Sequence, residues 1–142
     1  NAAHKQRAVS MVVAAGKKRV GVLGLSFKDG TDDLRESPTV ELVEQLIGKG
    51  YSVRIFDPHV SVTRLTGANK AYIDRELPHI ASLLVNDVAA LIAESDTIVA
   101  TKRAPHYAMA LEAIRPDQVV VDLVRLFKDG QVREEQYDAL VG

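Results

Sequence analysis

The 142-residue sequence contains no cysteine. A disulfide framework, a cysteine-based zinc site and a thiol nucleophile are therefore excluded within this chain. An excess of charge of one sign is also missing, because 18 basic residues stand against 19 acidic ones and leave a formal net charge of -1. That balance gives no overall field to attract nucleic acid or an anionic membrane, so an anionic ligand has to be met by local side chains.

Long apolar runs are absent as well. No run approaches the roughly 20 residues that a membrane helix needs, and the opening residues 1–7 lack the apolar segment of a signal peptide. We therefore expect a cytoplasmic protein that contacts neither membrane nor nucleic acid. The sequence begins without methionine inside an expected helix, which predicts a piece of a longer polypeptide.

Two common kinds of catalytic pattern are also missing. The four histidines are scattered, without a second ligand at helical or hairpin spacing, and give little support to a metal site: His4, His59, His79 and His106. No Gly-x-Ser-x-Gly elbow or Ser-His-Asp pattern indicates a hydrolase. For His106 we favour a surface position at a helix start over contact with a ligand.

What the sequence does contain is a regular alternation of short apolar runs and amphipathic stretches. The apolar runs predict strands over 19–25, 51–56, 82–85, 96–101 and 118–124. Helices are expected over 2–15, from Pro38 with Ser37 as N-cap, from Asp87 to about Glu94, and over 105–114, with helical turns near 62–66 and 72–77. This rhythm predicts a Rossmann-like, three-layer α/β domain with a mostly parallel five-stranded sheet in the order 3-2-1-4-5.

Length and composition favour one domain. We expect residues 17–142 to form that domain and residues 1–16 to be the end of a helix that links it to a preceding part. In open parallel sheets, ligands bind beyond the carboxyl ends of the strands, at the point where the strand order reverses. The loops after the strands at 19–25 and 96–101 are therefore the expected places for a site.

The first of these loops, residues 26–36, is rich in charge. Lys28 and Arg35 can present an ammonium and a guanidinium to phosphate or carboxylate groups. Asp32, Asp33 and Glu36 are interpreted as supporting groups that orient the two cations; because they stay ionised there, they are not expected to act as acid/base catalysts. A solvated polar loop is an equal alternative on charge alone, although long polar loops between a buried strand and a capped helix are often functional.

The end of the first strand does not carry the dinucleotide fingerprint Gly-x-Gly-x-x-Gly. Gly21 and Gly24 have the wrong spacing, and the turn does not lead directly into a helix. Asp57, after the run 51–56, stands where a ribose-binding acid would stand in a dinucleotide fold. Without the fingerprint, an aspartate in a strand-end turn is the favoured interpretation.

Several segments together resemble the C-terminal domain of the UDP-glucose/GDP-mannose dehydrogenase family. Residues 20–28 read Val-Gly-Val-Leu-Gly-Leu-Ser-Phe-Lys, and residues 31–38 read Thr-Asp-Asp-Leu-Arg-Glu-Ser-Pro, like the signature that opens that domain. Residues 53–58 (Val-Arg-Ile-Phe-Asp-Pro) and 119–123 (Val-Val-Val-Asp-Leu) agree with it. The stretch Gly-Ala-Asn-Lys at 67–70 is similar to the GDP-mannose branch.

The resemblance implies an enzyme of polysaccharide biosynthesis that oxidises the C6 alcohol of a nucleotide sugar to a carboxylate, in two NAD-dependent steps and through a thioester on a cysteine. The cysteine and the NAD-binding domain would precede this chain, which would be the sugar-nucleotide-binding domain and inactive alone. The full-length enzyme would be a homodimer or a higher oligomer.

The same match implies roles for individual residues. Phe27 and Lys28 would contact the nucleotide sugar, and Arg35 would reach toward NAD in the other domain; a core position for Phe27 is an equal alternative. Arg125 would also contact the substrate, although it is shifted by one residue from the family's arginine, which turns it to the other side of an extended strand. Residues 101–106 depart from the pattern of UDP-glucose members and leave the base and the sugar open.

Two other classes of function remain alternatives. A free-standing nucleotide-binding or regulatory module would have no dehydrogenase partner, and an open reading frame with an upstream Rossmann fingerprint and cysteine would decide against it. A structural or oligomerisation domain would show no stabilisation by ligand in a thermal melt.

Overall fold

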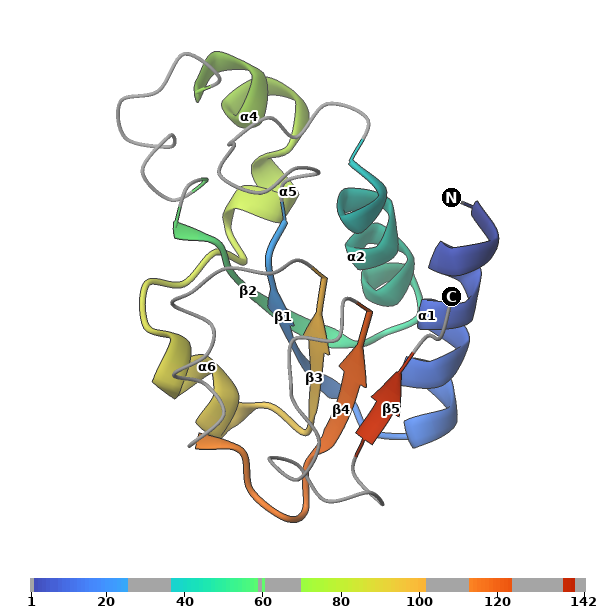
Figure 1. Cartoon of the computed structure of the whole chain (residues 1–142). Helices are drawn as coiled ribbons and strands as arrows, with labels where there is room; N and C mark the ends of the chain where they lie inside the picture. The colour runs from blue at the N-terminus through green and yellow to red at the C-terminus, as the bar shows by residue number, and fades with distance from the viewer. Residues whose placement is uncertain are drawn as a thin grey trace.

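The computed structural model describes residues 2–25, 37–58, 60, 70–101, 113–123 and 137–139, without the side chains of 2–5 and 137–139. Along the chain the elements are α1 (Ala2–Ala15), β1 (Arg19–Leu23), α2 (Pro38–Gly48), β2 (Ser52–Phe56), α4 (Lys70–Glu76), α5 (Pro78–Ala81), α6 (Val88–Glu94), β3 (Thr97–Ala100), β4 (Val119–Asp122) and β5 (Tyr137–Ala139) (Figure 1). Among the described residues, no helix is both long and apolar enough to cross a membrane.

The strands form one parallel sheet in the order β2-β1-β3-β4-β5. β1 lies inside it, with Leu23 opposite Phe56 of β2 on one side and Ala100 of β3 on the other. The chain runs from β1 to β2 in one direction and later adds β3 on the opposite flank of β1. The strand order therefore reverses between β1 and β3, and the expected α/β class with a parallel sheet is confirmed.

The sheet has five strands, but they are not the five predicted from the sequence. Residues 82–85 make only an isolated bridge, in which Leu84 pairs with Ile55 on the outer edge of β2. Leu83, just before the bridge, still belongs to the turn that ends α5, because its N–H donates to the Ile80 carbonyl. Little extended chain is therefore left to pair with β2. The fifth strand is β5 beside β4, which the prediction missed because Tyr-Asp-Ala is too short and too polar to form an apolar run.

Helices cover both faces of the sheet. Strand side chains alternate between faces, so Val20 and Val22 of β1 point into the larger core with α1 and α2, whereas Leu23 joins a smaller cluster under α6. Figure 1 shows α1 and α2 side by side on one face and α6 on the other. The two cores fix β1 from both sides.

The predicted helix starts are confirmed where they are described. Ser37 accepts a hydrogen bond from Val40 N–H at the start of α2, with Pro38 in the first turn, and Asp87 accepts from Ala89 and Ala90 at the start of α6. The turns expected near 72–77 correspond to α4. The turns expected at 62–66, and the helix expected over 105–114 except for its last two residues, lie outside the described residues.

Close packing holds α6 on β1. A Cβ atom on Gly21 would lie 2.5 Å from Leu91 Cδ2 and 2.5 Å from Ser95 Oγ, so glycine allows the helix to approach the strand. At the end of α6, the buried Gln118 side chain donates from Nε2 to the carbonyls of Ile92 (2.6 Å) and Ser95 (2.8 Å). The two bonds cap the carboxyl end of α6 and tie it to the start of β4.

Candidate functional site

The carboxyl ends of β1 and β3 lie side by side, as the strand order predicted. The chain leaves β1 at Gly24 and Leu25, and it leaves β3 at Thr101. Ser37, before α2, and Asp57, after β2, reach the same place through hydrogen bonds. We refer to these five residues as the rim.

Gly24 turns the chain out of β1. Its φ of 102° lies in the left-handed region that favours glycine. Its N–H donates to Phe56 at 2.9 Å, and its carbonyl accepts from the Thr101 hydroxyl at 2.8 Å. The Thr101 hydroxyl also lies 3.0 Å from the Leu23 carbonyl, so this side chain ties the end of β3 to the end of β1.

Both backbone groups of Leu25 are bonded to side chains from other elements. Its N–H donates to Asp57 Oδ2 at 2.8 Å, and its carbonyl accepts from Ser37 Oγ at 2.8 Å. Leu25, Ser37 and Asp57 are all buried. A buried backbone group that loses its partner costs about 1–3 kcal/mol, so these two side chains stabilise the chain at the point where it leaves the sheet.

The rim holds together the two ends of segment 26–36. The bond between Ser37 and Leu25 joins the residue before the segment to the residue after it. Six of the predicted site residues belong to this segment and lie outside the described residues: Phe27, Lys28, Asp32, Asp33, Arg35 and Glu36. Arg125 and His106 also lie outside them, so the roles of all eight stay predictions.

The position of Asp57 is that of an aspartate in a strand-end turn, the interpretation that the sequence favoured. Its side chain is fully buried, and its second oxygen, Oδ1, accepts from Val60 N–H at 3.4 Å. Both carboxylate oxygens thus bind backbone N–H groups inside the protein. The sequence did not reveal the role of Thr101, because the only signal was a hydroxyl on the last residue of an expected strand.

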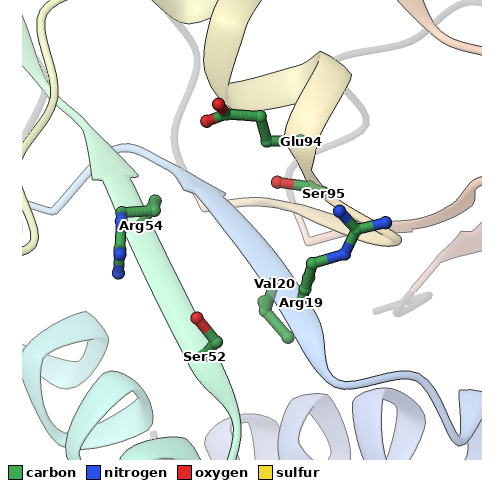
Figure 2. Close-up of a pocket in the computed structure, with 6 residues that line it drawn as sticks. All are labelled: Arg19, Val20, Ser52, Arg54, Glu94 and Ser95. Atoms are coloured by element: carbon green, nitrogen blue, oxygen red, sulfur yellow. The ribbon is translucent and has the colours of Figure 1, made fainter.

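A groove of about 300 Å³ lies at the end of the sheet opposite the rim, where β1 and β2 begin and α6 ends (Figure 2). Its lining residues are Arg19, Val20, Ser52, Arg54, Glu94 and Ser95. The Arg19 guanidinium is already bonded to Asp96 at 2.9 and 3.1 Å, a hydrogen bond that lowers the pKa of Asp96. The carboxyl end of a helix also carries partial negative charge, so this groove suits an anionic nucleotide less well than the rim.

Metal-ligating side chains do not gather in the described part of the chain. No group of three or more histidine, aspartate or glutamate residues there could hold a metal ion. His79 of α5 instead pairs with Glu44 of α2 at 2.9 Å.

Comparison with known proteins relates this chain to nucleotide-sugar dehydrogenases. A family model described as "UDP-glucose/GDP-mannose dehydrogenase family, UDP binding domain" matches residues 21–129. The chain is similar to GDP-mannose 6-dehydrogenase of Pseudomonas aeruginosa, with 54% identity over 99 residues, which cover 70% of this chain and 23% of that protein. The chain thus spans about a quarter of the length of this curated relative.

Two solved structures share the fold. A ternary complex of GDP-mannose dehydrogenase from Pseudomonas aeruginosa superposes with a TM-score of 0.91 at 42% identity, over 98% of this chain and 31% of that one. A UDP-glucose dehydrogenase from Pyrobaculum islandicum gives a TM-score of 0.67 at 28% identity, over 97% of this chain and 29% of that one. Both comparisons extend over nearly the whole of the present chain.

Proposed function

Because this chain belongs to the UDP-glucose/GDP-mannose dehydrogenase family, with a match to its UDP-binding domain, we propose that it binds the nucleotide sugar for a larger NAD-dependent 6-dehydrogenase. The observation that carries this proposal is the extent of the family match. Residues 21–129 contain the whole rim, and also residues 26–36 and 102–106, which follow Leu25 and Thr101 in the sequence. The ligand would therefore lie beyond the carboxyl ends of β1 and β3, where open α/β sheets bind ligands.

GDP-mannose is the ligand that we propose. The chain is closer in sequence and fold to the GDP-mannose enzyme of Pseudomonas aeruginosa than to the UDP-glucose enzyme of Pyrobaculum islandicum. Segment 101–106, which begins at Thr101 of the rim, also departs from the pattern of UDP-glucose members.

Segment 26–36 supplies the proposed contacts. Lys28 would donate to the diphosphate, because an ammonium forms strong charge-assisted hydrogen bonds with phosphate oxygens. Phe27 would pack against the ligand, and Arg35 would reach toward NAD in the neighbouring domain. The acids Asp32, Asp33 and Glu36 would orient these cations, and Arg125 would approach from the segment after β4.

The reactive groups would come from the rest of the enzyme. This chain contains no cysteine that could form a thioester. Its described residues also do not fit a dinucleotide cradle, since α2 begins 15 residues after the end of β1 and Asp57 is turned inward. We therefore propose that a preceding domain holds both the cysteine and NAD, and that residues 1–16 end the helix that leads from it.

Further features follow from the family and stay proposals. Closure of the two domains over the substrate would exclude water from hydride transfer. The complete enzyme would work in the cytoplasm as a homodimer or a higher oligomer.

Calorimetric titration tests the proposal. GDP-mannose, UDP-glucose and a UDP-N-acetylhexosamine are titrated into this chain and into the full-length enzyme. We expect GDP-mannose to bind best and Lys28→Ala to weaken its binding by about tenfold, the loss expected for one charge-assisted hydrogen bond.

Lys17→Ala is the matched control, since Lys17 bonds to the Asp117 carbonyl near the start of β4, at the other edge of the sheet. It should leave the affinity unchanged. Equal affinities of the Lys28→Ala variant and the wild type would contradict the assigned site.

A further inference from the structure

We propose that Asp57 is a positioning residue for the nucleotide-sugar site, because its buried carboxylate fixes the point at which the binding segment leaves the sheet. This inference rests on the proposed function. Asp57 would not touch the ligand itself. It would act through the backbone of Leu25, the last residue before segment 26–36.

The sheet itself sets the place of Asp57. Its neighbour Phe56 is opposite Leu23 in the parallel ladder, so Asp57 arrives at the level where β1 ends. At the ends of β1 and β2, Gly24 N–H donates a backbone hydrogen bond to the Phe56 carbonyl. Beyond it the Asp57 side chain continues the connection, with Oδ2 on Leu25 N–H.

This connection is needed because Gly24 changes the direction of the chain. With its φ of 102°, Gly24 takes the next N–H out of the strand ladder. Leu25 is fully buried, so its N–H has to find an acceptor inside the protein. The Asp57 side chain supplies that acceptor, because its Oδ2 accepts from Leu25 N–H at 2.8 Å.

Leu25 is consequently anchored in three ways. Its side chain lies in the larger core, its N–H binds Asp57 and its carbonyl binds Ser37. Lys28 follows only three residues later in the sequence. A segment that starts from a fixed residue loses less conformational freedom when a ligand binds, and a misplacement of about 1 Å can reduce the rate of a reaction by about a hundredfold.

Two substitutions at Asp57 test the role. Asp57→Ala removes both acceptors, whereas the amide oxygen of Asp57→Asn can still accept from Leu25 but its NH2 group cannot accept from Val60. With GDP-mannose titrated well below the melting temperature of each variant, we expect Kd to rise about tenfold for Asp57→Ala and less for Asp57→Asn. Should the alanine variant fail to fold, the asparagine variant carries the test.

Gln118→Met provides a control matched for loss of stability. It removes buried hydrogen bonds at the opposite edge of the sheet, so it should lower the melting temperature and leave Kd within about twofold. An unchanged Kd for Asp57→Ala, or an equal rise in Kd for Gln118→Met, would overturn the inference.

The two proposals fail in different ways. If the wild-type chain binds none of the nucleotide sugars, the proposed function is wrong and this inference falls with it. If the wild-type chain binds and the Asp57 variants bind equally well, only the positioning role is wrong. In the full-length enzyme, a positioning role predicts partial recovery of KM in Asp57→Asn relative to Asp57→Ala, which a general loss of stability would not produce.

Discussion

The hydroxyl of Ser37 donates a 2.8 Å hydrogen bond to the carbonyl of Leu25, and this bond closes segment 26–36 at its base. The same oxygen accepts from Val40 N–H and caps α2. One serine thus caps α2 and bonds to the residue before segment 26–36, which connects the stability of α2 to the geometry of the rim.

Substitutions of Ser37 should separate these two roles. Ser37→Ala loses both bonds and is expected to lower the free energy of unfolding by about 1–2 kcal/mol. Glycine replaces serine as an N-cap at a cost of only a few tenths of a kcal/mol, so most of the loss in Ser37→Gly, about 1 kcal/mol, would come from the bond to Leu25. Urea denaturation measures both values, and a glycine variant as stable as the wild type would show that the Leu25 bond contributes nothing.

Gly21→Ala should destabilise the protein by about 1–3 kcal/mol, the usual range for overpacking in a core. The new methyl group would lie 2.5 Å from atoms of Leu91 and Ser95, so α6 would have to move away from β1. Gly48→Ala is the control, because Gly48 is the last residue of α2 and a Cβ there meets nothing within 4 Å. It should be neutral or stabilising by up to about 1 kcal/mol in the same denaturation experiment.

Two threonines at the ends of β3 should respond in opposite ways to the same substitution. The Thr97 hydroxyl is buried without a hydrogen-bond partner in the described part of the structure, so Thr97→Val should stabilise by about 1 kcal/mol. The Thr101 hydroxyl donates to the carbonyls of Leu23 and Gly24 at the end of β1, so Thr101→Val should destabilise by about 1 kcal/mol. Thermal unfolding of the two variants tests this, and a shift of both melting temperatures in the same direction would contradict the assignment.

The ion pair between Arg19 and Asp96 predicts a pH dependence of stability. The hydrogen bond from Arg19 lowers the pKa of Asp96 in the folded protein. Stabilisation from a depressed carboxyl pKa is complete above the unfolded value of about 3.9 and is lost as pH falls through the lower, folded-state pKa. The wild type should therefore exceed Asp96→Asn in stability at neutral pH, by a small amount because both side chains contact solvent.

Urea midpoints of these two proteins, measured from neutral pH to about pH 3, test the sign of the effect. The difference should shrink as the solution becomes more acidic. A difference that grows in acid would mean that Asp96 is not stabilised in its charged form.

Much of the fold follows from local patterns in the sequence. The run from Val20 to Leu23 is apolar on both faces, as a strand between two helical layers requires, and Ser37-Pro38 marks the start of α2. Residues 82–85 were predicted to form a strand but make only an isolated bridge, because their apolar pattern has no room to extend. Residues 137–139 escaped prediction, because they have no apolar pattern. Their pairing depends on neighbours that are distant in sequence.

The place where the strand order reverses could be predicted from the sequence, but the hydrogen bonds around it could not. The reversal of strand order between β1 and β3 was predicted from the alternation of elements, and the sheet shows it. The hydrogen-bonded residues Leu25 and Asp57 are 32 residues apart in the sequence, and Gly24 and Thr101 are 77 residues apart. Such contacts arise only once strands are ordered in space, which is why a single aspartate or threonine after a strand carries little local signal.

The inner position of β1 has a consequence for biosynthesis. Within this sheet, β1 precedes the other strands in the sequence, and its pairing with β2 needs the chain only as far as Phe56. The other edge of β1 has no partner until Ala100 has been added. More than 40 residues after Phe56 are therefore synthesised while the backbone groups on that edge of an apolar strand stay unpaired. Exposed edges of this kind invite pairing with other chains. Nascent chains that end between β2 and β3 should therefore be the ones that depend most on chaperones.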